Sequence, residues 1–340
     1  MFYLVALPLG LVLSLLLTPL AIAVAVRCSF FDMPDGKRYH RSAVPLLGGV
    51  AFTASVTAAW LLTRLVVGPL IETAEVILII GLLSSFSLGM YDDKNGMKAR
   101  WKLLGQFVCG SLLVTACYAG GWTDAGLLFP FLVVWVVAIM NAMNFLDNMD
   151  GIASGVTGLA SLAFVLLLAL NKQWVGVIIA GATCGASLGF LKFNFAPAKI
   201  FLGDAGSLPM GYLLSALSIM AAGSADLQAM VAPLIVLGYP VFDMSFVTVV
   251  RIKEHRKFYQ GGKDHSSHRL ASLLLSPRKT SLVIYALCLT LGGIALLVDG
   301  FGSPALSFSV LAAVFACFIL LGLRLEKVAS NTPPLESATR

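Results

Sequence analysis

Long apolar segments alternate with short polar ones along the chain. A helix needs about 20 apolar residues to cross the roughly 30 Å hydrocarbon core of a bilayer. Segments of this kind cover 3–26, 46–66, 74–91, 102–121, 125–143, 155–170, 174–191, 206–223, 228–250, 281–299 and 304–323. A membrane β-barrel would require apolar and polar residues to alternate, and residues 11–17 show no such alternation. The pattern predicts an all-α polytopic membrane protein with about eleven transmembrane helices.

The composition agrees with a membrane protein. The chain has 340 residues, of which 59% are hydrophobic and 12% are charged, whereas soluble domains carry about 25% charged residues. So few charges cannot cover the surface of a soluble protein of this size. This excludes a soluble enzyme and a disordered scaffold.

The basic residues predict the orientation in the membrane. One set of alternate segments, 27–45, 92–102, 144–154, 192–205, 251–280 and 324–340, holds 21 of the 23 Lys and Arg residues. Cytoplasmic loops carry such an excess, so we expect the N-terminus outside and the C-terminus in the cytoplasm. Topology then explains the net charge of +6, and no nucleic-acid partner is expected. We expect one membrane domain, 1–325, and a cytoplasmic tail, 326–340.

Acidic residues divide between the two faces. Five of the 17 lie on or near the predicted outer side, where we expect solvated loop charges: Glu72, Glu75, Asp124, Asp226 and Asp299. On the inner side, Asp92 and Asp93 are adjacent and precede Lys102. Adjacent carboxylates both ionise readily only near water, a cation or a metal ion. A charged helix end in solvent is the other explanation for this pair.

Two further groups of polar side chains stand at span ends. Asn144, Asp147 and Asp150 are spaced by three, which keeps them on one broad helix face. Their oxygens suit Mg²⁺, although a capped helix end would also explain them. Asp204 directly precedes a span. It is either an N-cap or part of a helix N-terminus that attracts phosphate.

The long segment 251–280 adds cationic side chains. His265, His268 and Arg269 lie close together in it. No further Cys or His completes a zinc set, and plain surface residues are an alternative explanation. Beside a carboxylate-held Mg²⁺, these side chains would suit phosphate oxygens. Acids, amides and cations on one membrane face favour phosphate or pyrophosphate chemistry. A P-loop ATPase is excluded, because no G-x-x-x-x-G-K-[ST] motif exists.

These segments, in this order, resemble the polyprenyl-phosphate N-acetylhexosamine-1-phosphate transferases, glycosyltransferase family 4. The resemblance covers roughly 10–325 and rests on DMPDGKRYHRSAVPLLGG, DDKNGMKARWKLLGQ, NAMNFLDNMDG, NFAPAKIFLGDAGSLPMG and DHSSHRL. It implies Mg²⁺-dependent transfer, with Mn²⁺ as a substitute ion, of a sugar-1-phosphate from a UDP-sugar to undecaprenyl phosphate. UMP leaves and a lipid-linked diphosphate sugar forms at the cytoplasmic face of the bacterial inner membrane. Whether the protein forms a homodimer is left open.

The resemblance also implies roles for individual residues. It places Asp92, Asp93 and Asp147 at catalytic positions, and Asn144 and Asp204 at metal-coordinating ones. The substrate-binding positions are Lys102, Asp150, Asn194, His265, His268 and Arg269. The chain departs from the fuller H-x-H-H motif at Ser267 and lacks the adjacent His triplet of the phospho-N-acetylmuramoyl-pentapeptide transferase. The departure at Ser267 leaves the identity of the sugar open. The missing His triplet favours N-acetylglucosamine, with the muramoyl-pentapeptide enzyme as the alternative within the family.

Two questions stay open from the sequence. In a direct transfer, Asp92 or Asp93 would accept the proton of the lipid phosphate or hold that phosphate in line for attack, while Mg²⁺ neutralises the leaving group. In the rival route, an aspartate attacks first and forms a covalent intermediate. A different class of protein would be a secondary transporter that relays protons through Asp92, Asp93 and Asp243. Transporter sites usually lie near the midplane, whereas most of these charges fall at the inner boundary.

Overall fold

The computed structural model of the chain describes residues 2–32, 43–68, 71–124, 126–224, 226–257, 262, 264–300 and 303–328. Its elements are η1 (Phe2–Val5), α1 (Ala6–Arg27), β1 (Phe31–Asp32), β2 (Val44–Pro45), α2 (Gly48–Val67), α3 (Thr73–Asn95), α4 (Ala99–Ala119), η2 (Gly126–Leu128), α5 (Phe129–Leu146), α6 (Ile152–Leu170), α7 (Trp174–Asn194), α8 (Asp204–Ala222), α9 (Val231–Val236), α10 (Gly238–Lys253), α11 (Ser266–Leu274), α12 (Pro277–Asp299) and α13 (Pro304–Glu326). The two short strands pair antiparallel.

The prediction of an all-α polytopic membrane protein is confirmed. Among the described residues, ten helices are long and apolar enough to span a membrane. They match ten of the eleven predicted segments to within a few residues at each end. The chain is therefore a multi-pass membrane protein.

The ninth predicted segment, 228–250, is not one continuous helix. It is divided at Leu237 into α9 and α10, and neither part reaches the length of a span. Pro240 lies in the first turn of α10, where its missing N–H costs little, whereas inside a continuous helix it would leave the carbonyl of Val236 without a donor. A count of apolar residues does not register this break.

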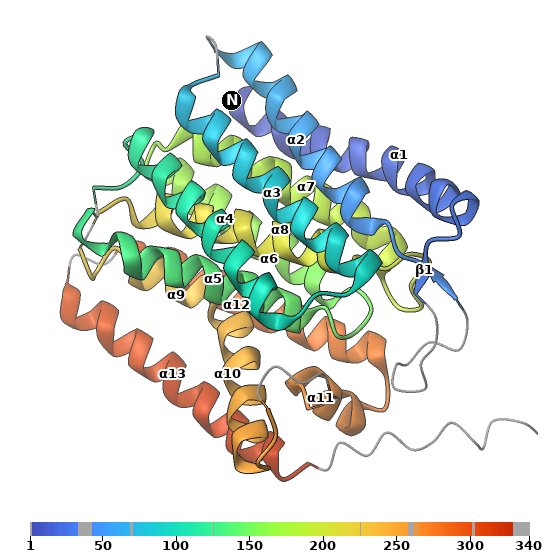
Figure 1. Cartoon of the computed structure of the whole chain (residues 1–340). Coiled ribbons are helices and arrows are strands. Elements are labelled where there is room, and N and C mark those ends of the chain that lie inside the picture. The colour runs from blue at the N-terminus through green and yellow to red at the C-terminus, as the bar shows by residue number, and fades with distance from the viewer. Residues whose placement is uncertain are drawn as a thin grey trace, which may run out of the picture.

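Helix α8 lies at the centre of the bundle. It packs against α2, α3, α4, α5, α6 and α7, and nearly all of its residues are buried (Figure 1). By contrast, α13 is buried at few positions. The residue at the N-terminus of α8 is therefore surrounded by the ends of several other helices.

Small residues allow the helices to approach closely, and α7 has glycine at every fourth position at Gly181, Gly185 and Gly189. A Cβ atom on Gly185 would lie 2.0 Å from the carbonyl oxygen of Leu7, so α7 can pack this tightly on α1 only with glycine there. Gly89 has the same relation to α8, because a Cβ atom on it would lie 2.2 Å from the carbonyl oxygen of Asp204. These contacts fix α3 and α8 side by side at the position of the acidic residues.

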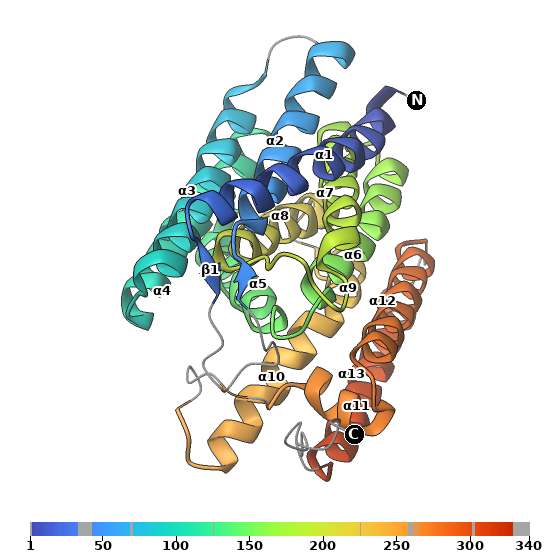
Figure 2. The same ribbon diagram turned by 90° about the vertical axis from the view of Figure 1, so that its right-hand side faces the viewer.

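The predicted cytoplasmic segments meet at one end of the bundle, which we name the acidic end. There Gly48 N donates to Phe201 O (3.0 Å), Phe201 N donates to Pro45 O (2.8 Å) and Ala198 N donates to Asp150 Oδ2 (2.8 Å). Helices α10 and α11 and the last turn of α13 lie at the same end (Figure 2). The shared end agrees with the predicted alternation of loops, and which side of the membrane it faces stays a prediction.

One expectation about the opposite end is wrong. Glu75 is fully buried instead of solvated: its Oε2 pairs with Arg64 Nη2 at 2.8 Å, and its Oε1 accepts from Trp60 Nε1 at 3.0 Å. A carboxylate without water needs such partners, and they come from a different helix, α2. We name Trp60, Arg64 and Glu75 the outer cluster.

Candidate active site

Five polar side chains meet at the acidic end from the ends of four helices. Asp92 and Asp93 lie in the last turn of α3, Lys102 in the first turn of α4, Asn144 in the last turn of α5, and Asp204 is the first residue of α8. The predicted loop segment 92–102 is thus largely helical, with residues 96–98 between α3 and α4, whereas residues 147–151 and 195–203 form non-helical connections. Rigid helix ends position the charges.

Lys102 is the centre of this group. Its Nζ lies 3.0 Å from Asp92 Oδ2 and 3.2 Å from Asn144 Oδ1, and it also pairs with Asp204 Oδ2. Asn144 Nδ2 donates to Asp204 Oδ1 at 2.5 Å and to Ser207 Oγ at 3.0 Å. The side chains of Lys102, Asp92 and Asp204 are 16%, 15% and 26% exposed. We name Asp92, Lys102, Asn144 and Asp204 the lysine cluster. Its charged side chains contact one another and remain partly exposed to solvent.

Asp93 has a different environment from its neighbour Asp92. Its two oxygens accept the backbone N–H groups of Asp204 and Ala205, both at 2.9 Å. These are free donors at the N-terminus of α8, so Asp93 caps that helix from outside. A Cβ atom on Gly203 would lie 2.6 Å from Asp93 Oδ2, which explains why glycine stands there. The two adjacent aspartates therefore separate into one that faces Lys102 and one that holds α8.

The oxygen atoms around Lys102 also suit a divalent cation. Two carboxylates and one amide oxygen, from Asp92, Asp204 and Asn144, already surround a single positive charge. Mg²⁺ is commonly held by one or two carboxylates with the rest of its shell from water and substrate phosphates. No group of three or more His, Cys, Asp or Glu side chains in the described part of the chain is arranged as a metal site by itself.

A second group of polar side chains centres on Asp243 of α10, which is fully buried. Asp243 Oδ2 lies 2.9 Å from His265 Nδ1, and its Oδ1 accepts from Ser266 N at 2.8 Å and from Ser266 Oγ at 2.6 Å. Asp243 thus caps α11 and fixes the ring of His265. Tyr239 OH, 3.1 Å from Ser266 Oγ, extends the network.

Asp264 precedes this group and is held by two arginines. Arg251 Nε donates to its Oδ2 at 3.2 Å, and Arg256 Nη2 donates to its Oδ1 at 2.6 Å. Burial raises the pKa of Asp264, but the hydrogen bonds and charges of Arg256 and Arg251 outweigh burial, so the pKa lies below its usual value. The segment before α11 is thereby attached to α10.

The turn between α5 and α6 links the two groups. Ser267 Oγ donates to Asn148 Oδ1 at 2.6 Å. The ring of Phe145 lies 6.0 Å from the ring of His265 at an angle of 83°, and the Arg251 guanidinium lies over it at 5.5 Å. Phe145 directly follows Asn144. The lysine cluster and the histidine segment, by which we mean residues 264–269, therefore share one helix end. Sequence reasoning missed Phe145, Arg251 and Ser207, because nothing in an apolar or basic run marks them.

The remaining predicted residues lie around this centre. Asp147 and Asp150 stand in the turn after α5, where Asp150 Oδ2 accepts from Ala198 N. Asn194 is buried and its amide is engaged within the chain: Oδ1 accepts from Gly151 N (3.1 Å) and Ser154 Oγ (2.9 Å), and Nδ2 donates to Ile200 O (3.0 Å). In the structure Asn194 stabilises the start of α6 and the connection before α8 through these hydrogen bonds. Its contact with substrate stays a prediction.

The two last predicted residues separate in space. The ring of His268 lies 5.9 Å from that of His265. Arg269 instead donates its Nη1 to the carbonyl oxygens of Leu325, Glu326 and Val328 at 2.9–3.1 Å, so it caps the C-terminus of α13. The structure does not bring Arg269 to the lysine cluster. The basic residues of 33–42, part of the first quoted motif, lie outside the described residues.

Comparisons with known proteins identify the family of this chain. A family model described as glycosyl transferase family 4 matches residues 75–222, which include the whole lysine cluster. A protein of Bacillus subtilis (strain 168) named a probable undecaprenyl-phosphate N-acetylglucosaminyl 1-phosphate transferase is 33% identical over 297 residues, or 83% of this chain and 80% of that protein.

Two other relatives represent different branches. A decaprenyl-phosphate N-acetylglucosaminephosphotransferase of Mycobacterium tuberculosis is 30% identical over 77% of this chain and 74% of its own length. A phospho-N-acetylmuramoyl-pentapeptide-transferase of Levilactobacillus brevis is 34% identical over 55% and 65%. The chain belongs to glycosyl transferase family 4, the polyprenyl-phosphate N-acetylhexosamine-1-phosphate transferases, and is a membrane-embedded phosphosugar transferase.

Proposed function

We propose that the protein transfers N-acetylglucosamine-1-phosphate from a UDP-sugar to undecaprenyl phosphate. UMP leaves, and a lipid-linked diphosphate sugar forms that initiates a cell-envelope polysaccharide. The reaction takes place at the acidic end of the bundle, which we place at the cytoplasmic face of the bacterial inner membrane. The names of the Bacillus and Mycobacterium relatives support the donor sugar and the acceptor class.

The observation that carries the proposal is the position of Lys102 among Asp92, Asn144 and Asp204. A lipid phosphate and a UDP-sugar repel each other because both are anions. A cation at the mouth of converging helix ends can offset that repulsion. The site also lies at the end of membrane-spanning helices, where a lipid headgroup and a water-soluble nucleotide can meet.

The bond changes define what the residues must do. An oxygen of the lipid phosphate bonds to the β-phosphorus of the UDP-sugar, the bond from that phosphorus to the bridging oxygen breaks, and the electron pair leaves with UMP. Lys102 holds the phosphates close in line. Asp92, which faces Lys102, accepts the proton of the lipid phosphate or orients it. Asp93 is occupied by the N-terminus of α8 and positions Asp204.

We also propose that Mg²⁺ is required, with Mn²⁺ as a substitute. Asn144 and Asp204 would hold it, and Asp92 is the next oxygen donor at the same place. When bound, the ion supplies charge neutralisation to the pyrophosphate and its leaving group. Lys102, which pairs with these oxygens in the described structure, would then turn to the phosphates.

Two alternatives make different predictions. A covalent route would leave a sugar-phosphate adduct on an aspartate, and trapping such an adduct by mass spectrometry would contradict direct transfer. Phospho-N-acetylmuramoyl-pentapeptide as the transferred group would follow the Levilactobacillus relative. The sequence DHSSHRL lacks the adjacent His triplet expected of that enzyme, which supports the smaller sugar.

The test uses purified full-length protein with undecaprenyl phosphate, Mg²⁺ and a panel of UDP-sugars, scored by release of UMP. We expect release with UDP-N-acetylglucosamine that depends on both the lipid and the ion. Release only with UDP-N-acetylmuramoyl-pentapeptide would replace the proposed sugar. No release with any sugar, from folded protein, would overturn the proposal.

A further inference from the structure

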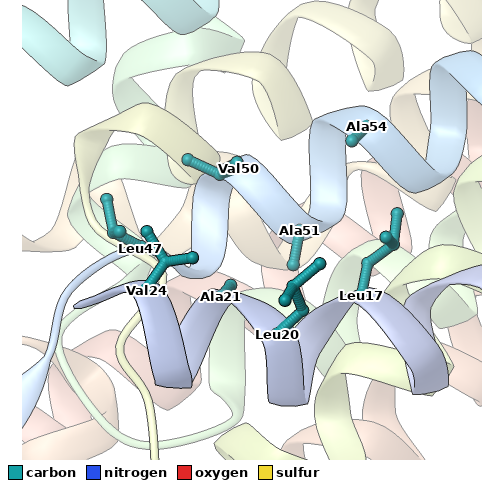
Figure 3. A pocket seen from close by; sticks show the side chains of 8 residues that line it. All are labelled: Leu17, Leu20, Ala21, Val24, Leu47, Val50, Ala51 and Ala54. Carbon is teal, nitrogen blue, oxygen red and sulfur yellow. The ribbon is translucent and has the colours of Figure 1, made fainter. Parts of the chain in front are cut away.

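The helices of the bundle pack mainly through apolar side chains. Between α1 and α2, for example, a hollow of about 140 Å³ is lined only by apolar residues, among them Leu17, Val24 and Val50 (Figure 3). Contacts of this kind are non-directional, so they hold two helices together without fixing how far one slides along the other. The contact between α4 and α5 is different.

Two side-chain amides bind each other between α4 and α5. Asn141 Nδ2 donates to Gln106 Oε1 at 2.8 Å, and Gln106 Nε2 donates to Asn141 Oδ1 at 3.3 Å. Asn141 Nδ2 also donates to Val137 O of its own helix at 2.8 Å, and Gln106 is fully buried. We name Gln106 and Asn141 the amide pair.

The amide pair lies directly behind the lysine cluster. Gln106 follows Lys102 by four residues on α4, and Asn141 precedes Asn144 by three on α5, so each amide shares a helix face with a residue of the cluster. The separation along the helix is about 6 Å on α4 and about 4.5 Å on α5. Two successive polar contacts therefore join these helices: Lys102 with Asn144 at 3.2 Å, and the amide pair behind it.

Further from the acidic end the contact between α4 and α5 becomes apolar. A Cβ atom on Gly110 would lie 3.3 Å from Val133 Cγ1, so the two helices approach closely there. An unpaired amide in such surroundings would be costly, and two apolar side chains would fill the space of the amide pair at little cost in stability. What the amides add is direction, because a hydrogen bond weakens steeply as its distance and angle change.

We propose that the amide pair is a positioning pair for the reaction: it fixes the register of α4 against α5 and thereby holds Lys102 at Asn144. A slip of one residue would move Lys102 by about 1.5 Å along the helix, and a misplacement of about 1 Å can lower a rate about 10²-fold. Single buried amides fix the register of packed helices in coiled coils. This inference rests on the proposed function, since it gives Gln106 and Asn141 a part in that reaction without contact with substrate.

The kinetic test replaces both amides by apolar side chains of similar size. In Gln106→Leu/Asn141→Leu no amide is left unpaired, so we expect the thermal midpoint to stay near that of the unsubstituted protein or to rise. We expect kcat for UMP release to fall about 30-fold, with smaller changes in the KM for undecaprenyl phosphate and for the UDP-sugar. A stable double variant with unchanged kcat would overturn the proposal, because the amides would then only hold the helices together.

The matched control is Ser218→Ala. Ser218 Oγ accepts from Trp135 Nε1 at 2.9 Å, so this change also removes a hydrogen bond between two helices, α5 and α8. Ser218 lies about 21 Å along α8 from Asp204. We expect a lower thermal midpoint and an unchanged kcat, and a loss of kcat equal to that of the double variant would overturn the proposal.

A second variant keeps the test decisive if the double variant does not fold. Gln106→Met keeps an unbranched side chain of similar length and removes both hydrogen bonds of the amide pair. We expect kcat per folded molecule to fall as in the double variant, although the thermal midpoint falls as well because the amide of Asn141 loses its partner. A normal kcat in folded Gln106→Met would overturn the proposal.

A chemical test reports the placement of Lys102 without any turnover. The Lys102 side chain is 16% exposed within the lysine cluster, whereas Lys98, just before α4, is exposed. Each protein is treated briefly with acetic anhydride, and acetylation of the two lysines is compared by mass spectrometry. We expect the ratio of Lys102 to Lys98 acetylation to rise in Gln106→Leu/Asn141→Leu and to stay unchanged in Ser218→Ala. An unchanged ratio in the double variant would overturn the proposal.

The two readouts separate this inference from the proposed function. A raised acetylation ratio in a protein that releases no UMP from any UDP-sugar would leave the positioning of Lys102 standing and overturn the proposed function alone. Equal release of UMP by the unsubstituted protein and the double variant would leave the function standing and overturn the role of the amide pair.

Discussion

The outer cluster and the lysine cluster contain similar side chains at opposite ends of the same bundle, yet they are built differently. In the outer cluster one carboxylate, Glu75, meets one guanidinium, Arg64, and the carboxylate is fully buried. In the lysine cluster one ammonium meets two carboxylates, and all three side chains keep some contact with solvent. The first is neutral and closed, whereas the second has an excess of negative charge and is open.

This difference separates structural charges from functional ones. A closed, buried pair has no capacity left for a ligand, and removing one partner leaves an unpaired buried charge. An open group with surplus oxygens can exchange its internal cation for a metal ion or a substrate. The two clusters therefore predict opposite results for comparable substitutions.

The largest expected effect on activity comes from the lysine cluster. Asp204→Ala removes a carboxylate that contacts both Lys102 and Asn144. We expect turnover to fall about 10³-fold, equivalent to about 4 kcal/mol, with a smaller change in thermal stability. UMP release measures the fall. Glu326→Gln, at an exposed ion pair with Lys253, is the control and should retain turnover; a fully active Asp204→Ala would end the distinction between the clusters.

The outer cluster should show the reverse behaviour. Glu75→Ala leaves Arg64 buried without its carboxylate, which costs about 3–5 kcal/mol of stability. We expect a lower thermal midpoint and less folded protein, while turnover per folded molecule stays near normal. Lys172→Gln, at an exposed charge in the connection between α6 and α7, should change neither quantity. A turnover defect in Glu75→Ala at normal stability would show that the outer cluster also takes part in the reaction.

The adjacent residues Asp92 and Asp93 show the same contrast between a functional and a structural charge. Asp92→Asn removes a charge that faces Lys102, so we expect turnover to fall about 10²-fold with stability retained. Asp93→Asn removes one of two acceptors at the N-terminus of α8 and should cost about 1 kcal/mol of stability, with a smaller loss of turnover. Paired thermal melts and UMP assays would test this order, and equal profiles for both variants would contradict it.

Asp264 gives a smaller expected effect on stability than Glu75, and this effect depends on pH. Its pKa is below the usual value in the folded protein despite burial, because Arg256 and Arg251 bind the carboxylate. A lowered folded-state pKa stabilises the protein above about pH 4, and the stabilisation is lost as the pH falls through the folded-state pKa. Asp264→Asn should therefore lower stability by about 1–2 kcal/mol between pH 5 and 8, and the difference should shrink below about pH 4. A difference that grows in acid would show the opposite shift.

The helices were predictable from the sequence because a span requires a long apolar run, and such a run is visible without any tertiary information. The ninth segment shows the limit of this signal. Hydropathy averaged over 228–250 is high, but the backbone break at Leu237 depends on where Pro240 falls in a turn. Glu75 shows another limit, since a position near the membrane boundary does not reveal a buried partner on α2.

The sequence indicates which residues gather at the site, but it does not indicate what each of them contacts. Adjacent residues on a helix point about 100° apart, so Asp92 and Asp93 look equivalent in the sequence and differ in space. The same applies to His268 and Arg269, of which only Arg269 turns to the end of α13. The link from Ser267 to Asn148 joins residues 119 positions apart, and no local pattern indicates it.

The cap that Arg269 places on α13 has a practical consequence for handling the protein. Its acceptors are the backbone oxygens of Leu325, Glu326 and Val328, and Arg269 follows His268 directly in α11. An affinity tag or a truncation that starts before residue 328 would remove some of these hydrogen bonds. The segment that carries His265 and His268 would then be held less firmly against α13. Fusions at the C-terminus should therefore keep the chain through Val328 and begin only after it.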